Sequence, residues 1–131
     1  MHRILQPDGW KRPAGYANGM TARGRQVFVA GQIGWDAQER IVGDDFIAQL
    51  EQALRNVVAV LRAGDAGPEH IARMTWYLAD REEFNARGEE IGAVYRKVIG
   101  PIFPAMTAIQ VSGFVEPAAK VEIEVTAVVP D

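Results

Sequence analysis

The amino-acid sequence predicts an α+β protein in which two helices cover one face of a mixed β-sheet of about six strands. Strand-like segments with alternating apolar residues stand before, between and after two segments with helical periodicity. The 131 residues suffice for one hydrophobic core, and neither a repeat nor a linker divides them. We therefore expect residues 1–131 to form a single two-layer sandwich.

The first two strands are predicted in residues 16–21 and 26–33, of which the second is rich in β-branched and apolar residues. The residues between them, 22–25, contain a glycine and would join the two strands as a hairpin. A further short strand is expected at residues 41–42. In the second strand, alternate residues would share one face, namely Val27, Val29, Gly31 and Ile33.

The clearest helix follows these strands. Asp44 is the predicted N-cap, Asp45 adds negative charge to the first turn, and Gly64 is the predicted stop. Apolar residues recur at helical spacing and form one buried stripe, which consists of Phe46, Leu50, Ala53, Val57 and Leu61.

A strand and a second helix come next. Residues 71–79 alternate between apolar and polar side chains, as a half-buried strand does. Asp80 is the predicted N-cap of the second helix, and Glu83 would complete a capping box. Gly88 and Gly92 weaken this helix by roughly 1 kcal/mol each relative to alanine, which favours close packing as the reason for their presence.

The last two strands are predicted in residues 105–111 and 121–129. Odd-numbered residues of the second segment are apolar and would face the core, whereas Glu122 and Glu124 would point the other way. The sheet face without helices needs a cover, and an oligomer interface is the natural one. Large apolar residues are expected on the sheet surfaces, namely Phe28, Trp76 and Ile109.

Composition argues against several classes of function. The net charge is −3, and Arg12, Arg23 and Arg25 make only a loose cluster, so we expect no nucleic-acid partner. The apolar stretches are too short to span a membrane. There is no cysteine, and His2 and His70 have no partner at metal spacing, so we expect neither a metal nor a cofactor. A cytoplasmic location is the default.

Several motifs in the same order resemble the Rid family, also called YjgF or L-PSP, whose namesake is an enamine/imine deaminase. Residues 29–33 look like the family's V-S-G-Q-I, and the helix after Asp44 is similar to its Q-x-x-x-A-L-x-N stretch. Residues 103–105 and 121–124 resemble its F-P-A-R and V-E-I-E. The resemblance covers residues 16–129. It implies a chorismate-mutase-like fold and a homotrimer whose clefts between neighbouring subunits bind a small planar acid.

The resemblance also assigns site residues. The family's tyrosine falls on Tyr16, its water-positioning glutamate on Glu122, and the glycine that lends a backbone N–H on Gly31. The family's carboxylate-binding arginine falls on Met106. The next residue in the same motif, Thr107, is also expected to bind the substrate. Structural roles remain open, since Tyr16 suits a half-buried turn and a strand glycine often marks a bulge.

The residue at position 106 bears on the substrate. An arginine fork holds a planar carboxylate with two charge-assisted hydrogen bonds, whereas methionine has no donor and offers an apolar wall. We therefore expect either a less anionic substrate or another basic residue that meets the carboxylate. Arg73 and Arg96 are candidates that the sequence cannot place. The asparagine found on the family's second helix aligns with Gly92.

Two of these assignments have alternatives. Beside an apolar wall Glu122 would suit an acid/base role, but it could equally lie exposed on an edge strand or pair with Arg73 or Lys120. Trp35 could line the mouth of the cleft and form an apolar pocket with Met106, or it could pack between subunits.

Three functions are consistent with these features. The first is hydrolytic deamination of an enamine or imine other than the usual 2-imino acids, in a cleft between subunits. The second is a non-catalytic, metabolite-binding trimer. Ribonuclease activity is the third, and the acidic balance of the chain argues against it.

Overall fold

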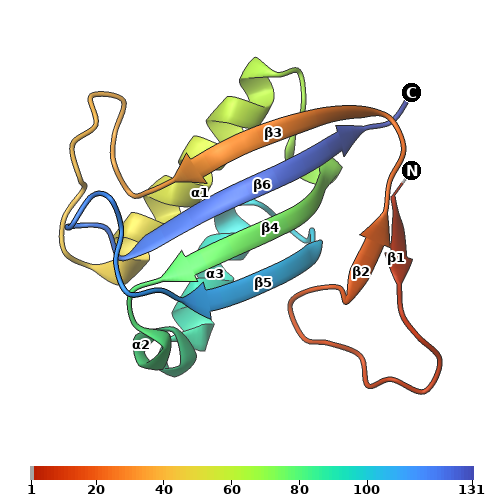
Figure 1. Cartoon of the computed structure of the whole chain (residues 1–131), viewed down its shortest axis with the longest axis horizontal. Helices are drawn as coiled ribbons and strands as arrows, with labels where there is room; N and C mark the ends of the chain where they lie inside the picture. Colours follow the sequence, from red (N-terminus) through yellow and green to blue (C-terminus); the bar gives the residue numbers. More distant parts are fainter. Residues whose placement is uncertain (1) are drawn as a thin grey trace.

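The computed structural model describes residues 2–131, which form two sheets and the helices that pack on one of them (Figure 1). The elements in chain order are β1 (Arg3–Leu5), β2 (Gly19–Thr21), β3 (Arg25–Gln32), α1 (Phe46–Ala63), the 3-10 helix η1 (Pro68–His70), β4 (Ile71–Leu78), α2 (Arg81–Ala86), α3 (Gly88–Val98), β5 (Ala105–Gln110) and β6 (Val121–Val129).

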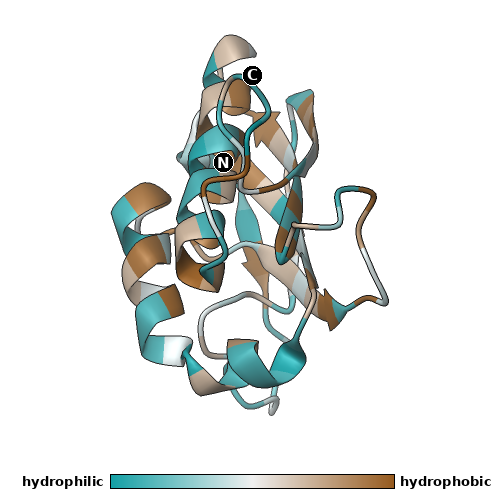
Figure 2. Ribbon diagram, turned by 90° about the vertical axis from the view of Figure 1, so that its left-hand side faces the viewer, coloured by the Kyte–Doolittle hydropathy of each residue, from teal (hydrophilic) through white to brown (hydrophobic). Residues whose placement is uncertain are grey.

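The main sheet is mixed and has the strand order β3-β6-β4-β5. Strands β4 and β5 run parallel, and the other neighbours are antiparallel. Both α1 and α3 lie behind this sheet in Figure 1, and the view in Figure 2 shows the helices on one side of the strands. The predicted α+β sandwich of two layers is therefore confirmed, and one sheet face carries no helix. We call this face the open face.

The strands are divided differently from the prediction of one sheet of about six strands. Strand β2 pairs with β1 in a separate two-stranded sheet, while β3 pairs with β6, so the predicted hairpin between β2 and β3 is wrong. Gly24 lies between them at φ +143°, with its backbone against the carbonyl of Val129, which directs the chain onto β6. The predicted strand at residues 41–42 is a single bridge between Trp35 and Ile41.

Helix α1 begins one residue later than predicted. Its N-cap is Asp45 rather than Asp44, because the Asp45 carboxylate accepts the backbone N–H of Ala48 at 3.0 Å. Gly64 is the C-cap, as predicted. The predicted stripe is buried together with Gln49, whose side chain donates to the carbonyls of Gly43 and Ala118 and accepts the backbone N–H of Lys120, so it ties the segment before α1 to the loop before β6.

The second predicted helix consists of two. Asp80 caps α2 as expected, but Arg87 breaks the helix and becomes the N-cap of α3. The expected capping box does not form, since Glu83 binds the guanidinium of Arg87 instead. The same guanidinium binds Glu90 and Asp45, at 2.7 and 3.1 Å. These contacts hold the start of α3 against the start of α1.

The core lies between the helices and the main sheet. Trp76 is 1% exposed there, so the expectation of Trp76 at a sheet surface is wrong, because its position on β4 faces α3. Phe28 and Ile109 do lie on the open face, at 70% and 51% exposure. No helix between residues 2 and 131 has the length and apolar character that crossing a bilayer requires.

Candidate functional site

A groove of about 770 Å³ separates α3 from β5 and from the segment that leads into β2. We call it the α3 groove. Its lining residues are Ala14, Gly15, Tyr16, Trp76, Phe84, Gly88, Ile91, Gly92, Tyr95, Arg96, Phe103, Met106, Thr107 and Ala108. The volume lies within the range of small-molecule sites, and the walls are mainly apolar and aromatic, as such sites usually are.

Aromatic rings form much of this groove. Trp76 meets Phe84 edge to face, with ring centres 6.2 Å apart, and Tyr95 stacks on Phe103 at 5.9 Å. The Tyr95 hydroxyl donates to the carbonyl of Ile102, and burial raises the pKa of Tyr95, so this ring stays neutral. The indole N–H of Trp76 is buried and has no partner among residues 2–131.

Three of the residues that the sequence proposed for the site lie together in this groove. Tyr16 is 41% exposed, and the next residue, Ala17, bonds Pro104 just before β5. Met106 is on β5, opposite Met74 of β4 and on the helix side of the sheet. Thr107 follows it at the rim. The local reason is the bridge at Ala17, which carries Tyr16 to the start of β5.

Arg96 brings a positive charge to the same groove. A Cβ placed on Gly92 would lie 3.2 Å from Nη1 of Arg96, so the guanidinium covers this glycine. Within residues 2–131 it takes part in no hydrogen bond or ion pair, whereas its neighbour Lys97 binds Glu51 at 3.2 Å. The sequence named Arg96 only as one of two candidates. The four-residue spacing from Gly92 on one helix was the available signal.

Glu122 and Gly31 meet on the open face. A Cβ on Gly31 would lie 2.0 Å from Oε2 of Glu122, so the carboxylate occupies the space that the glycine leaves. The strand pairing shifts between Val29 and Gln32, and this bulge turns Gly31 away from the core. The prediction that Gly31 shares a face with Val27 and Val29 is therefore wrong. In the part of the chain that the structure describes, no ion pair joins Glu122 to a basic residue.

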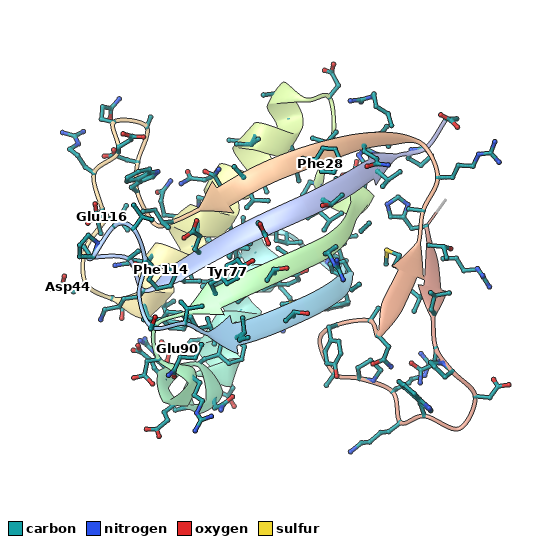
Figure 3. The ribbon with its side chains drawn as sticks, viewed as in Figure 1. Phe28, Asp44, Tyr77, Glu90, Phe114 and Glu116 are labelled. Carbon is teal, nitrogen blue, oxygen red and sulfur yellow. The ribbon has the colours of Figure 1, made fainter. Side chains whose placement is uncertain are left out.

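A second polar pair lies beside Glu122. Tyr77 stands opposite Glu122 in the strand register and donates to Glu124 at 2.6 Å, which raises the pKa of Tyr77. Figure 3 shows Tyr77 and Phe28 on the face of the sheet turned toward the viewer. Tyr77 was not among the residues proposed from the sequence, although the alternation of the strand predicts that it projects from the open face.

Trp35 lies apart from the α3 groove. It sits in the loop between β3 and α1, where its carbonyl accepts the side-chain N–H of Asn56 at 2.8 Å. It does not line the groove around Met106, so the two do not form a common pocket within one chain.

The candidate residues thus divide between the two sides of the main sheet. Tyr16 and Met106 belong to the helix side, and Gly31 and Glu122 belong to the open face, while Thr107 lines the groove at its rim and alternates with Met106 toward the open face. The described residues 2–131 contain no group of three or more metal-ligating side chains. What one chain offers is an apolar groove with one arginine on one side, and a free carboxylate on the other.

Comparison with known proteins shows which family the chain resembles. A family model described as Endoribonuclease L-PSP matches residues 10–129. The RutC family protein UK114 of Drosophila melanogaster is 33% identical over 86% of this chain and 79% of its own length. The Homo sapiens protein named 2-iminobutanoate/2-iminopropanoate deaminase is 30% identical over 79% of this chain and 73% of its own.

Solved structures agree with these matches. The Rid-family protein YyfB of Yersinia pestis superposes with a TM-score of 0.82 at 30% identity, covering 98% of both chains. A member of the YjgF/YER057c/UK114 family from Mycobacterium tuberculosis gives a TM-score of 0.64 at 32% identity, over 88% of both. Since sequence and fold agree over most of its length, this chain belongs to the Rid family, also called YjgF or L-PSP.

Proposed function

We propose that this protein hydrolyses an enamine or imine in a cleft that a second copy of the chain completes. The observation that carries the proposal is the division of the candidate residues between opposite faces of one sheet. A single chain cannot bring its own groove to its own Glu122, but a neighbour packed on the open face can. Relatives that are 30% identical and named as imine deaminases support the reaction type.

The proposed chemistry uses groups that the chain has free. Glu122 takes a proton from a water molecule, and the water oxygen adds to the carbon of the C=N bond. The nitrogen gains a proton, the resulting carbinolamine loses ammonia, and a carbonyl compound remains. The backbone N–H of Gly31, in the same chain as Glu122, would help to orient the substrate. The hydroxyl of Tyr16 would come from the neighbouring copy and serve the same purpose.

The assembly that we propose is a homotrimer. Phe28 and Ile109 are large, apolar and exposed on the open face, and contact between copies would remove them from water. Met106 would then border the cleft from the groove side, with Thr107 beside it at the rim, and the resemblance to the family implies that methionine stands here in place of an arginine. A small-molecule ligand and further copies of the chain are the proposed partners, in the cytoplasm, with no role for nucleic acid or membrane.

The test is turnover by the Glu122→Gln variant. Imines are generated from amino acids in solution, and the release of ammonia is followed with wild-type and variant protein. We expect a loss of roughly 10²–10⁴-fold in turnover, the usual contribution of one acid/base group. Both proteins should remain trimeric in sedimentation and bind 2-oxo acids equally. Undiminished turnover by the variant contradicts the proposal, and binding without turnover by the wild type would establish a metabolite-binding protein instead.

Ribonuclease activity is the second candidate, because the matching family model carries that description. The net charge of −3 argues against it, since single-stranded RNA is held by basic grooves with stacking aromatic rings. RNA cleavage that persists through stringent purification and disappears in Glu122→Ala would favour this candidate.

A further inference from the structure

The unpaired guanidinium of Arg96 is the starting point. In the part of the protein that the structure describes, Arg96 is the arginine that lines the α3 groove. Its Nη1 lies over Gly92, which has no side chain to obstruct it. An arginine that binds no carboxylate of its own chain keeps its donors available for an anion.

The rest of the groove is suited to an apolar group. Trp76, Phe84, Tyr95 and Phe103 supply aromatic surface, and the thioether of Met106 adds a polarizable wall. The volume of about 770 Å³ is far more than a three- or four-carbon acid fills.

From these observations we propose that Arg96 anchors the carboxylate of the ligand, and that the ligand is a 2-imino or 2-oxo acid with an aromatic side chain. This rests on the proposed function and names its substrate class. The positive charge reaches the groove from helix α3 rather than from strand β5, where Met106 stands. The aromatic rings and Met106 would hold the side chain of the ligand.

Two other arginines are weaker candidates for this role. Arg12 lines a smaller adjoining hollow of about 200 Å³, on the other side of Tyr16 and Phe103. Arg73 lies on the open face beside Glu124 and Thr126, across the sheet from Met106. Of these three arginines, Arg96 alone lines the same groove as Met106 and the aromatic rings in the described residues 2–131.

The experiment measures binding by calorimetry with three probes: phenylpyruvate, pyruvate, and phenylacetone, which has the ring and the ketone but no carboxylate. We expect the wild type to bind phenylpyruvate more tightly than either of the others. Arg96→Gln should weaken phenylpyruvate about ten- to a hundredfold, the effect of losing a charge-assisted contact, and should leave phenylacetone unchanged. Arg96→Lys should recover part of the loss, since it keeps the charge without the fork.

Two variants control for charge alone. Lys97→Gln removes the neighbouring positive charge of the same helix, and Arg12→Gln removes the arginine of the adjoining hollow; both should bind phenylpyruvate like the wild type. The proposal is overturned if the wild type does not bind phenylpyruvate, if pyruvate binds as tightly, or if Arg12→Gln matches the loss in Arg96→Gln. Turnover of small imines that depends on Glu122, without binding of phenylpyruvate, would reject this inference and leave the proposed function standing.

Discussion

The α3 groove and the open face use the same strands in different ways. On the helix side, β5 presents Met106 to a concave, aromatic surface with one unpaired arginine. On the open face, β3 and β6 bring Glu122 over Gly31 on an exposed surface, beside the Tyr77–Glu124 hydrogen bond. Successive residues of a strand point to opposite sides, so one sheet carries the aromatic groove and the Glu122 carboxylate without contact between them.

This division separates the expected effects of mutation. Changes in the α3 groove should alter which ligand binds and how tightly, whereas changes at Gly31 and Glu122 should alter the rate of the reaction. The separation holds only if two copies assemble so that the surfaces meet. Each of the following experiments would strengthen or remove the distinction between the two surfaces.

The largest effect is expected on turnover, from the substitution Gly31→Ala on the open face. The new Cβ would lie 2.0 Å from Oε2 of Glu122, so the carboxylate must leave its position. We expect turnover to fall by roughly 10²-fold or more, since a displaced acid/base group contributes little. The melting temperature should change little, because the atom that moves is the end of a flexible side chain.

Gly113→Ala is the matched control for this change. A Cβ at Gly113 meets no atom within 4 Å, so turnover and melting temperature should both match the wild type. Full activity in Gly31→Ala would show that the position of Glu122 does not matter for the rate. Changes on the open face would then not control the rate, and the two surfaces could not be distinguished in this way.

A smaller effect is expected from Met106→Arg in the α3 groove. A fork at position 106 supplies the two parallel donors that small carboxylates need, so kcat/KM for 2-iminobutanoate should rise by about tenfold or more. Stopped-flow or coupled assays of ammonia release measure this. A trimeric, folded variant without any gain would contradict the role that we give to this position.

Gly92→Ala should separate stability from binding. Alanine in a helix is favoured over glycine by roughly 1 kcal/mol, so thermal unfolding should shift upward. The new Cβ would lie 3.2 Å from Nη1 of Arg96, so the guanidinium must shift by a small distance and phenylpyruvate should bind about threefold more weakly. The substitution should have no further effect on binding in an Arg96→Gln background, and an additive loss there would point to another cause.

The smallest expected effect is on the melting temperature in acid, through the contact between Asp45 and Arg87 that holds the start of α3 against α1. The backbone N–H of Ala48 and then the guanidinium of Arg87 lower the pKa of Asp45. A lowered pKa means that this contribution to stability is present above the unfolded value, near 4, and is lost as the pH falls through the folded value. Asp45→Asn keeps a capping oxygen but loses the charge. Its melting temperature should therefore fall less between pH 5 and pH 3 than that of the wild type.

An equal acid-induced decrease in both proteins would show that Asp45 does not contribute to the attachment through its charge. Ligand binding in the α3 groove is the second readout, since α3 forms one wall. Phenylpyruvate binding should weaken with acid in the wild type, whereas Tyr77 on the open face, whose pKa is raised, keeps its proton throughout this pH range.

The elements of the fold were predictable where a single periodicity governs them. The stripe on α1 and the alternation in β4 and β6 identified the buried faces, since burial of apolar surface decides them locally. The N-cap of α1 was predicted one residue early, because Asp44 and Asp45 are chemically alike and only geometry selects between them. At the break of the second helix, Arg87 contacts Asp45, which is distant in the sequence, so the sequence spacing does not show this contact.

The sequence by itself determined the two-layer α+β architecture and the family, because periodicity and motif order are written in the chain, and it proposed Glu122, Tyr16 and Met106 as site residues. Only the tertiary structure decided that Arg96 reaches the α3 groove over Gly92, and that a bulge turns Gly31 under Glu122. Both depend on where side chains from distant or bulged segments project, and that is fixed by packing in three dimensions rather than by local sequence preference.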